Sequence, residues 1–103
     1  MYSNLFINIK KPNHDFSDRE KKILNLLITQ AIVSINDQIT QVPIGLHEQT
    51  MLSEDLLHHH VAFVSTIEHD MLENLKESIN TGIFSILQTL GVEDFNISYY
   101  LSN

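Results

Sequence analysis

The chain of 103 residues contains no cysteine, so disulfide bonds, thiolate metal sites and a cysteine nucleophile are all excluded. No apolar run approaches the roughly 18 residues that a membrane-spanning helix needs. The amino-terminal residues also lack the basic and then apolar layout of a signal peptide. Because small secreted domains more often carry disulfides, we expect a cytoplasmic protein without a membrane partner.

Basic residues are also few: there are six, against 13 acidic residues, which gives a formal net charge of −7 at pH 7. Nucleic acids and anionic membranes bind basic surfaces, so neither is an expected partner. Most of the basic residues lie near the start of the chain, where Lys10, Lys11 and Arg19 form a candidate site for a small acidic compound. The alternative is a solvated helix start whose cations are balanced by neighbouring acids.

Glycine-rich phosphate loops, Walker patterns and nucleophile elbows are absent as well. The sequence therefore gives no support for a nucleotide, nicotinamide or flavin, and we expect no cofactor. The length leaves room for one domain, residues 1–103, and a composition of 43% apolar and 18% charged residues is ordinary for a globular chain.

One order of elements, strand then helix then strand, occurs twice along the chain. The predicted elements begin at Leu5, Ser17, Ile39, Val61, Asp70 and Phe95. Alternation of apolar and polar residues marks the strands, and apolar residues three and four apart mark the helices. A capping box at residues 17–20 starts the first helix. The near-constant spacing predicts two β-α-β pseudo-repeats, residues 1–50 and 58–103.

The two inner strands of this order are predicted to differ in their place in the sheet. Pro43 and Gly45 suit an edge strand or a bulge over residues 39–48, because proline has no amide to donate to a neighbour and glycine has no side chain to pack. Residues 49–57 show no regular pattern and are interpreted as the connection between the repeats. Residues 61–67 are apolar on both sides, which is typical of a central strand.

We therefore predict an α+β fold of order β-α-β-β-α-β, with a four-stranded mixed sheet and both helices on one face. The ferredoxin-like sandwich is one such arrangement. The helix-free face of the sheet would carry Phe6, Asn8, Ala62, Val64, Ser98 and Tyr100. This mixture is too apolar for water and too polar for a deep core, so we expect a second subunit to cover it. The prediction is a homo-oligomer, either a dimer or a trimer.

Three segments give this layout a resemblance to a known family: residues 38–43 after the first helix, 60–64 at the start of the second half and 91–100 at its end. Together they resemble the tautomerase superfamily, which includes macrophage migration inhibitory factor and 5-carboxymethyl-2-hydroxymuconate isomerase. The resemblance implies a tautomerase-like fold, trimers or related rings, and proton transfer by an amino-terminal proline. Tyr2 follows Met1 here, so that activity is not expected and no catalytic residue is carried over.

A run of three histidines is the remaining candidate for chemistry. In an extended segment His58 and His60 point to the same face, and with His47 or Glu48 they could supply three ligands to zinc or another divalent metal. The alternative is a set of solvated imidazoles leading into a strand. Histidine titrates near pH 6.5, so protonation between about pH 7 and 5.5 could also alter assembly.

The sequence thus supports two functions. One is a small oligomeric protein, tautomerase-like or isomerase-like in layout but without the proline-based activity, that binds a small acidic compound. The other is a non-enzymatic acidic module that binds or regulates a protein partner. Turnover of an enolisable keto acid would favour the first.

Overall fold

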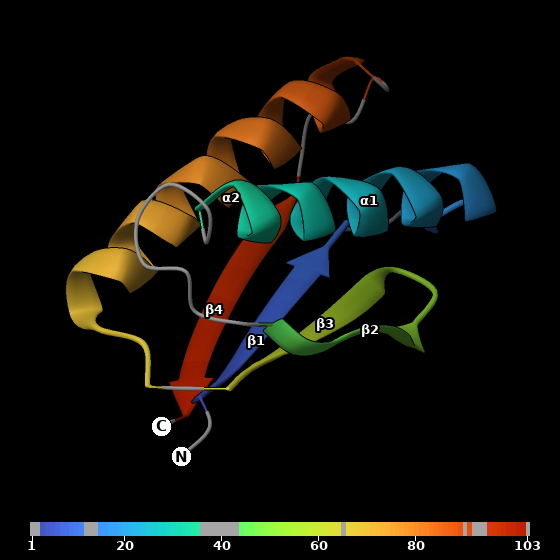
Figure 1. The fold of residues 1–103 in the computed structure, drawn as a ribbon. Coiled ribbons are helices and arrows are strands. Elements are labelled where there is room, and N and C mark those ends of the chain that lie inside the picture. Colours follow the sequence, from blue (N-terminus) through green and yellow to red (C-terminus); the bar gives the residue numbers. More distant parts are fainter. Residues whose placement is uncertain are drawn as a thin grey trace.

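The computed structural model describes residues 3–11, 15–35, 44–64, 66–89, 91 and 95–102. Its elements, in chain order, are β1 (Ser3–Lys10), α1 (Asp18–Ile35), β2 (Ile44–Ser53), β3 (Leu56–Phe63), α2 (His69–Thr89) and β4 (Asn96–Ser102). The predicted α+β order β-α-β-β-α-β is confirmed, and Figure 1 shows that both helices cover the same face of the sheet. None of the described helices is both long and apolar enough to cross a membrane.

The four strands are ordered β2-β3-β1-β4, and every neighbouring pair is antiparallel. This corrects the predicted mixed sheet. β1 and β2 point the same way, but β3 lies between them, and β1 likewise separates β3 from β4. Apolar alternation identifies a strand and the face that it buries, but it does not specify which other strand becomes its neighbour. With this order and pairing the fold is ferredoxin-like.

The second and third strands form a hairpin that the sequence pattern did not predict. β2 continues to Ser53, and a turn at Glu54 and Asp55 leads directly into β3, which ends at Phe63. Residues 49–57 are therefore mostly paired strand, not an irregular connection. The prediction failed because the polar and apolar residues of β2 do not alternate regularly and the histidines interrupt the apolar alternation of β3.

The predicted positions of these strands within the sheet are nevertheless right. β2 lies at an edge and β3 lies inside, between β2 and β1. The first part of the predicted edge strand, residues 39–43, lies outside the described residues.

The core lies between the helices and the sheet. Every second residue of β1 and of β3 is buried there. Its apolar members are Leu5, Ile7, Ile9, Phe16, Leu24, Ile28, Ile32, Leu57, Val61, Phe63, Ile67, Met71, Leu72, Leu75, Ile79, Ile83 and Leu87. Full burial of one such side chain contributes about 1.5–3 kcal/mol, so this layer provides most of the driving force for folding.

Local signals place the helices against this core. Ser17 Oγ accepts the Glu20 amide at 3.1 Å and the Glu20 carboxylate accepts the Ser17 amide at 2.9 Å, so the predicted capping box is confirmed. α2 starts one residue before its predicted start. A Cβ atom at Gly82 would lie 3.0 Å from the Leu27 side chain, so a glycine at this position lets α1 and α2 approach closely.

Candidate functional site

The helix-free face of the sheet is formed by the strand side chains that alternate with the core residues. By their positions in the strand registers, its members are Asn4, Phe6, Asn8, Lys10, Leu46, Glu48, Thr50, Ser53, Leu56, His58, His60, Ala62, Asn96, Ser98, Tyr100 and Ser102. Five of the six residues predicted for this face lie on it, and the sixth, Val64, follows the end of β3. The predicted mixture of apolar and polar groups is therefore present.

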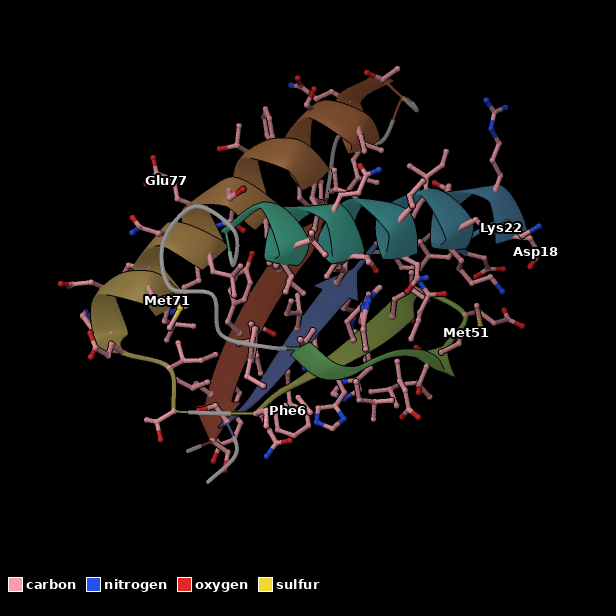
Figure 2. The ribbon with its side chains drawn as sticks, in the orientation of Figure 1. Phe6, Asp18, Lys22, Met51, Met71 and Glu77 are labelled. Atoms are coloured by element: carbon pink, nitrogen blue, oxygen red, sulfur yellow. The ribbon has the colours of Figure 1, made fainter. Side chains whose placement is uncertain are left out.

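Phe6 is the centre of a cluster of rings on the helix-free face. The His60 ring centroid lies 4.8 Å from that of Phe6 and the His58 centroid lies 5.6 Å away, with interplanar angles of 12° and 25°. Tyr100 adds a tilted ring at 6.0 Å. Figure 2 shows Phe6 on the side of the sheet away from the helices. Because Tyr100 is 64% exposed, the cluster presents aromatic surface to the outside.

Two asparagines of β1 hold the histidine rings of this cluster. Asn8 Oδ1 lies 2.6 Å from His58 Nδ1, and Asn4 Oδ1 lies 2.8 Å from His60 Nε2. An amide oxygen only accepts, so each contacting ring nitrogen carries the proton and donates it. In the neutral form of either histidine, the other ring nitrogen is an acceptor.

The helix-free face has a balanced charge although the chain is acidic. It carries one acid, Glu48, and one base, Lys10, whereas the chain has 13 acidic and six basic residues. A second acidic chain can therefore approach this face with little like-charge repulsion.

The middle histidine of the run lies on the other face of the sheet. His59 is completely buried; its Nδ1 lies 3.2 Å from His47 Nε2, and its Nε2 lies 3.3 Å from Gln49 Nε2. His47 Nδ1 lies 2.6 Å from Thr29 Oγ1, which donates to the Asn25 carbonyl at 2.9 Å. Polar side chains from β2, β3 and α1 therefore form one hydrogen-bonded chain on the helix side.

Backbone carbonyls define the direction of this hydrogen-bonded chain. Gln49 Nε2 donates to the Lys21 carbonyl at 2.8 Å, which identifies the contacting atom as the amide nitrogen, so His59 Nε2 is its acceptor. His59 Nδ1 then donates to His47, whose other nitrogen donates to Thr29. Every contact is satisfied with both imidazoles neutral. A proton added to either imidazole would turn its accepting nitrogen into a donor, which would then face another N–H donor.

This environment disfavours the charged form of the buried histidines. Burial, with smaller contributions from His47 and His58, lowers the pKa of His59 from 6.5 to about 3. Burial also lowers the pKa of His47. An imidazolium here would lose its hydration without gaining an acceptor, which is costly. The helix side of the sheet therefore keeps this histidine pair neutral at pH 7.

The structure does not bring the three predicted metal ligands together. His58 and His60 share the helix-free face, as predicted, whereas His47 lies on the opposite face against His59. Nor does the histidine run precede a strand, because it lies inside β3. Among the residues that the structure describes, no group of three histidine or acidic side chains is placed to hold a metal ion. The face that His47 takes depends on strand register, which the sequence pattern did not provide.

The predicted site for an acidic compound is not assembled either. Lys11 is buried, and its ammonium group contacts the two Glu20 carboxylate oxygens at 2.9 and 2.7 Å and the Asp15 carbonyl at 3.1 Å. These contacts use all three of its donors. Burial alone would raise the pKa of Glu20, but hydrogen bonds, above all from Lys11, keep it below its usual value. Lys10 lies on the helix-free face, and Arg19 is exposed in the first turn of α1.

A shallow groove beside β4 was not predicted. It lies between β4 and α2, has a volume of about 350 Å³ and is lined by Asn80, Phe84, Phe95 and Ile97. Phe84 is 53% exposed, and its ring centroid lies 6.0 Å from that of Phe95. Next to the groove, the Tyr99 hydroxyl donates to Asn80 Oδ1 at 2.6 Å. The sequence signal for this groove was Phe84, an apolar residue outside the buried stripe of α2.

Comparison with known proteins found no family model and no curated protein that match the chain. A de novo designed protein with a ferredoxin fold matches with a TM-score of 0.70 and 12% identity, over 100% of this chain and 86% of that chain. A second de novo designed protein matches with a TM-score of 0.62 and 12% identity, over 100% and 98%. A hydantoinase/carbamoylase family amidase from Burkholderia ambifaria gives 0.54 and 7%, over 99% of this chain and 27% of that chain. These similarities show the ferredoxin-like fold alone.

Proposed function

We propose that this chain is a non-enzymatic interaction module that works as a homo-oligomer, in which two copies pack their helix-free faces together. The observation that carries the proposal is the surface of that face, where an exposed Tyr100 joins the rings around Phe6 on a patch of balanced charge. Association removes aromatic and apolar surface from water, and it does so where two acidic copies repel least.

Packing of two sheets through these faces is physically reasonable. Sheets that pack face to face lie about 10 Å apart, which accommodates interdigitated side chains from both copies. A two-fold axis makes the contact self-complementary, because the same surface of each copy faces the other. The large ring of Tyr100 therefore contributes to the contact from both copies. The free ring nitrogens of His58 and His60 can accept hydrogen bonds from hydroxyl groups such as those of Thr50 and Ser98, so polar groups need not stay unpaired.

The alternative of a protein that binds a small acidic compound has less support. Lys11, the buried member of the predicted site, is already paired with Glu20. The tautomerase resemblance stays a prediction. Turnover of an enolisable keto acid by the purified protein would contradict the non-enzymatic proposal.

A matched pair of variants tests the face-to-face contact. Leu46 lies on the helix-free face and is 44% exposed, while Val33 lies on α1 and is 45% exposed. Native mass is measured by light scattering over a range of protein concentrations, and circular dichroism checks the fold. We expect an oligomer for the wild type, half that mass for Leu46→Asp, and the wild-type mass for Val33→Asp. A monomeric wild type, or Leu46→Asp with the wild-type mass, would overturn the proposal.

A further inference from the structure

We propose that the outer edge of β4, together with the groove beside it, pairs with the same edge of a second copy and joins two four-stranded sheets into one sheet of eight strands. This surface is distinct from the helix-free face. The inference therefore goes beyond the proposed face-to-face contact, and a separate observation carries it.

The two edges of the sheet differ in their protection against strand pairing. β2 has register shifts at Ile44/Leu46 and Met51/Ser53 and carries a charge at Glu48. Bulges and charges of this kind prevent an edge from accepting another strand. β4 has neither: Asn96–Ser102 contains no charged residue and no proline, and its register with β1 is uninterrupted.

Among the described strands, the outer side of β4 is also vacant, as expected for a strand at the end of a sheet. In the described part of the chain, β4 pairs with β1 alone and ends the sheet. A regular edge strand presents a row of amides and carbonyls that can bond to another extended chain. The outer side of β4 is therefore chemically suited to strand addition.

The groove provides what an added strand needs beyond main-chain hydrogen bonds. In strand addition, backbone bonds give affinity and pockets for alternate side chains give specificity. Phe84, Phe95 and Ile97 line such a pocket on the helix side of β4. An apolar side chain from a neighbouring strand would cover Phe84, which is otherwise 53% exposed.

A second copy suits this edge because β4 is self-complementary. In an antiparallel pair around a two-fold axis, each residue faces one from the other half of the same strand. Since no residue of Asn96–Ser102 is charged, no like charges meet across the new pair.

The charges on α2 are also compatible with this pairing. The axis would pass near Tyr99, in the middle of β4, and the Tyr99 hydrogen bond places Asn80 of α2 beside it. The α2 helices of the two copies would then run antiparallel. Glu73 and Glu77 precede Asn80, so they and their equivalents in the second copy would lie on opposite sides of the axis, which keeps these acids apart.

The two proposed contacts combine into a closed assembly. Two interfaces that each have a two-fold axis generate a tetramer of D2 symmetry when the axes are perpendicular and intersect. The β4 contact alone gives one dimer, and the helix-free contact alone gives another. The masses of suitable variants therefore distinguish the two proposals.

Native mass measured by light scattering is the primary test. Phe84→Glu charges the groove, and Leu26→Glu is its control on α1, where Leu26 is 59% exposed. We expect a tetramer for the wild type and for Leu26→Glu. Phe84→Glu and Leu46→Asp should each give a dimer. The variant that combines Phe84→Glu with Leu46→Asp should be a monomer. Leu46 lies on β2, at the opposite edge from β4, so its variant leaves the β4 edge unchanged.

Amide hydrogen exchange tests the edge directly. The β4 amides that point away from β1 should exchange at least about 100-fold more slowly in the wild type than in Phe84→Glu. Wild-type mass for Phe84→Glu, or outward β4 amides of the wild type that exchange as fast as an unstructured peptide, would overturn the inference. If Leu46→Asp keeps the wild-type mass while Phe84→Glu does not, the face-to-face proposal fails and the β4 contact stands.

Discussion

His58 and His59 are neighbours in the chain, but they lie on opposite faces of the sheet. His58 stacks on Phe6 and bonds to Asn8 on the helix-free face, whereas His59 is completely buried and joined to His47 on the helix side. The difference shows that a run of like residues in a strand is not one site, because alternate members belong to different surfaces.

The same division holds at two other places in the molecule. The pairs are Phe6 and Ile7 in β1, and Lys10 and Lys11 at its end. In each pair the residue on the helix side is buried and its neighbour is not. We infer that helix-side residues determine stability, while residues on the helix-free face contribute mainly to association.

Truncation at Ile7 and Phe6 should give the largest contrast between the two faces. Ile7 is completely buried, so Ile7→Ala leaves a cavity in the core and should lower the free energy of unfolding by about 3.5 kcal/mol. Phe6→Ala should cost less than half as much because Phe6 is only partly buried. Urea unfolding is measured in the Leu46→Asp background, so that association contributes less to the measured free energy of unfolding. Equal losses at the two positions would contradict the comparison.

The lysine pair should show a smaller contrast. Lys11→Met removes the cation that is paired with Glu20, whose side chain is 11% exposed, and should lower the free energy of unfolding by about 2.5 kcal/mol. Lys10→Met should change it by less than about 0.5 kcal/mol. Addition of Glu20→Gln to Lys11→Met should recover part of the loss, because it removes the unpaired carboxylate. A Lys11→Met protein as stable as Lys10→Met would show that the ion pair contributes nothing.

The histidine pair should differ in pH dependence. Because the pKa of His59 is about 3 when folded and 6.5 when unfolded, the unfolded chain binds a proton that the folded chain rejects. The contribution of His59 to the free energy of unfolding is therefore fully present above about pH 6.5, and it is lost as the pH falls toward 3. At about 1.36 kcal/mol per pH unit, we expect a loss of about 2 kcal/mol between pH 7 and 5.

Variants assign this pH dependence to one residue. His59→Phe should remove most of the change in urea midpoint between pH 7 and 5, and His58→Phe should retain it. If His59→Phe does not fold, the ring C–H resonance of His59 in the wild type should stay constant from pH 7 down to about pH 4. Titration of that resonance near pH 6 would contradict the proposed neutral pair.

Predictions based on local chemistry were the most accurate. The capping box of Ser17 and Glu20 formed because both hydrogen bonds lie within one helical turn. Phe6 and Tyr100 were assigned to the helix-free face because alternation within a strand does not depend on its neighbours. The predicted edge position of β2 is also right, and it was based on the proline and the glycine of residues 39–48, not on alternation.

Predictions that required contacts distant in sequence were less accurate. The antiparallel sheet, the hairpin of β2 and β3 and the face taken by His47 all depend on strand order and register. The groove of Phe84 depends on where α2 lies across the sheet. None of these is encoded in the period of a single segment.

The sequence by itself determined the order of elements, the start of α1, the burial of alternate strand residues and the scarcity of basic charge. These properties follow from interactions between residues a few positions apart and from composition. Only the tertiary structure decided that Lys11 is paired with Glu20, that His59 is neutral in the interior and that β4 is left as an unprotected edge. Each of these outcomes depends on which segments become neighbours, and that is settled by packing of the whole chain around one core.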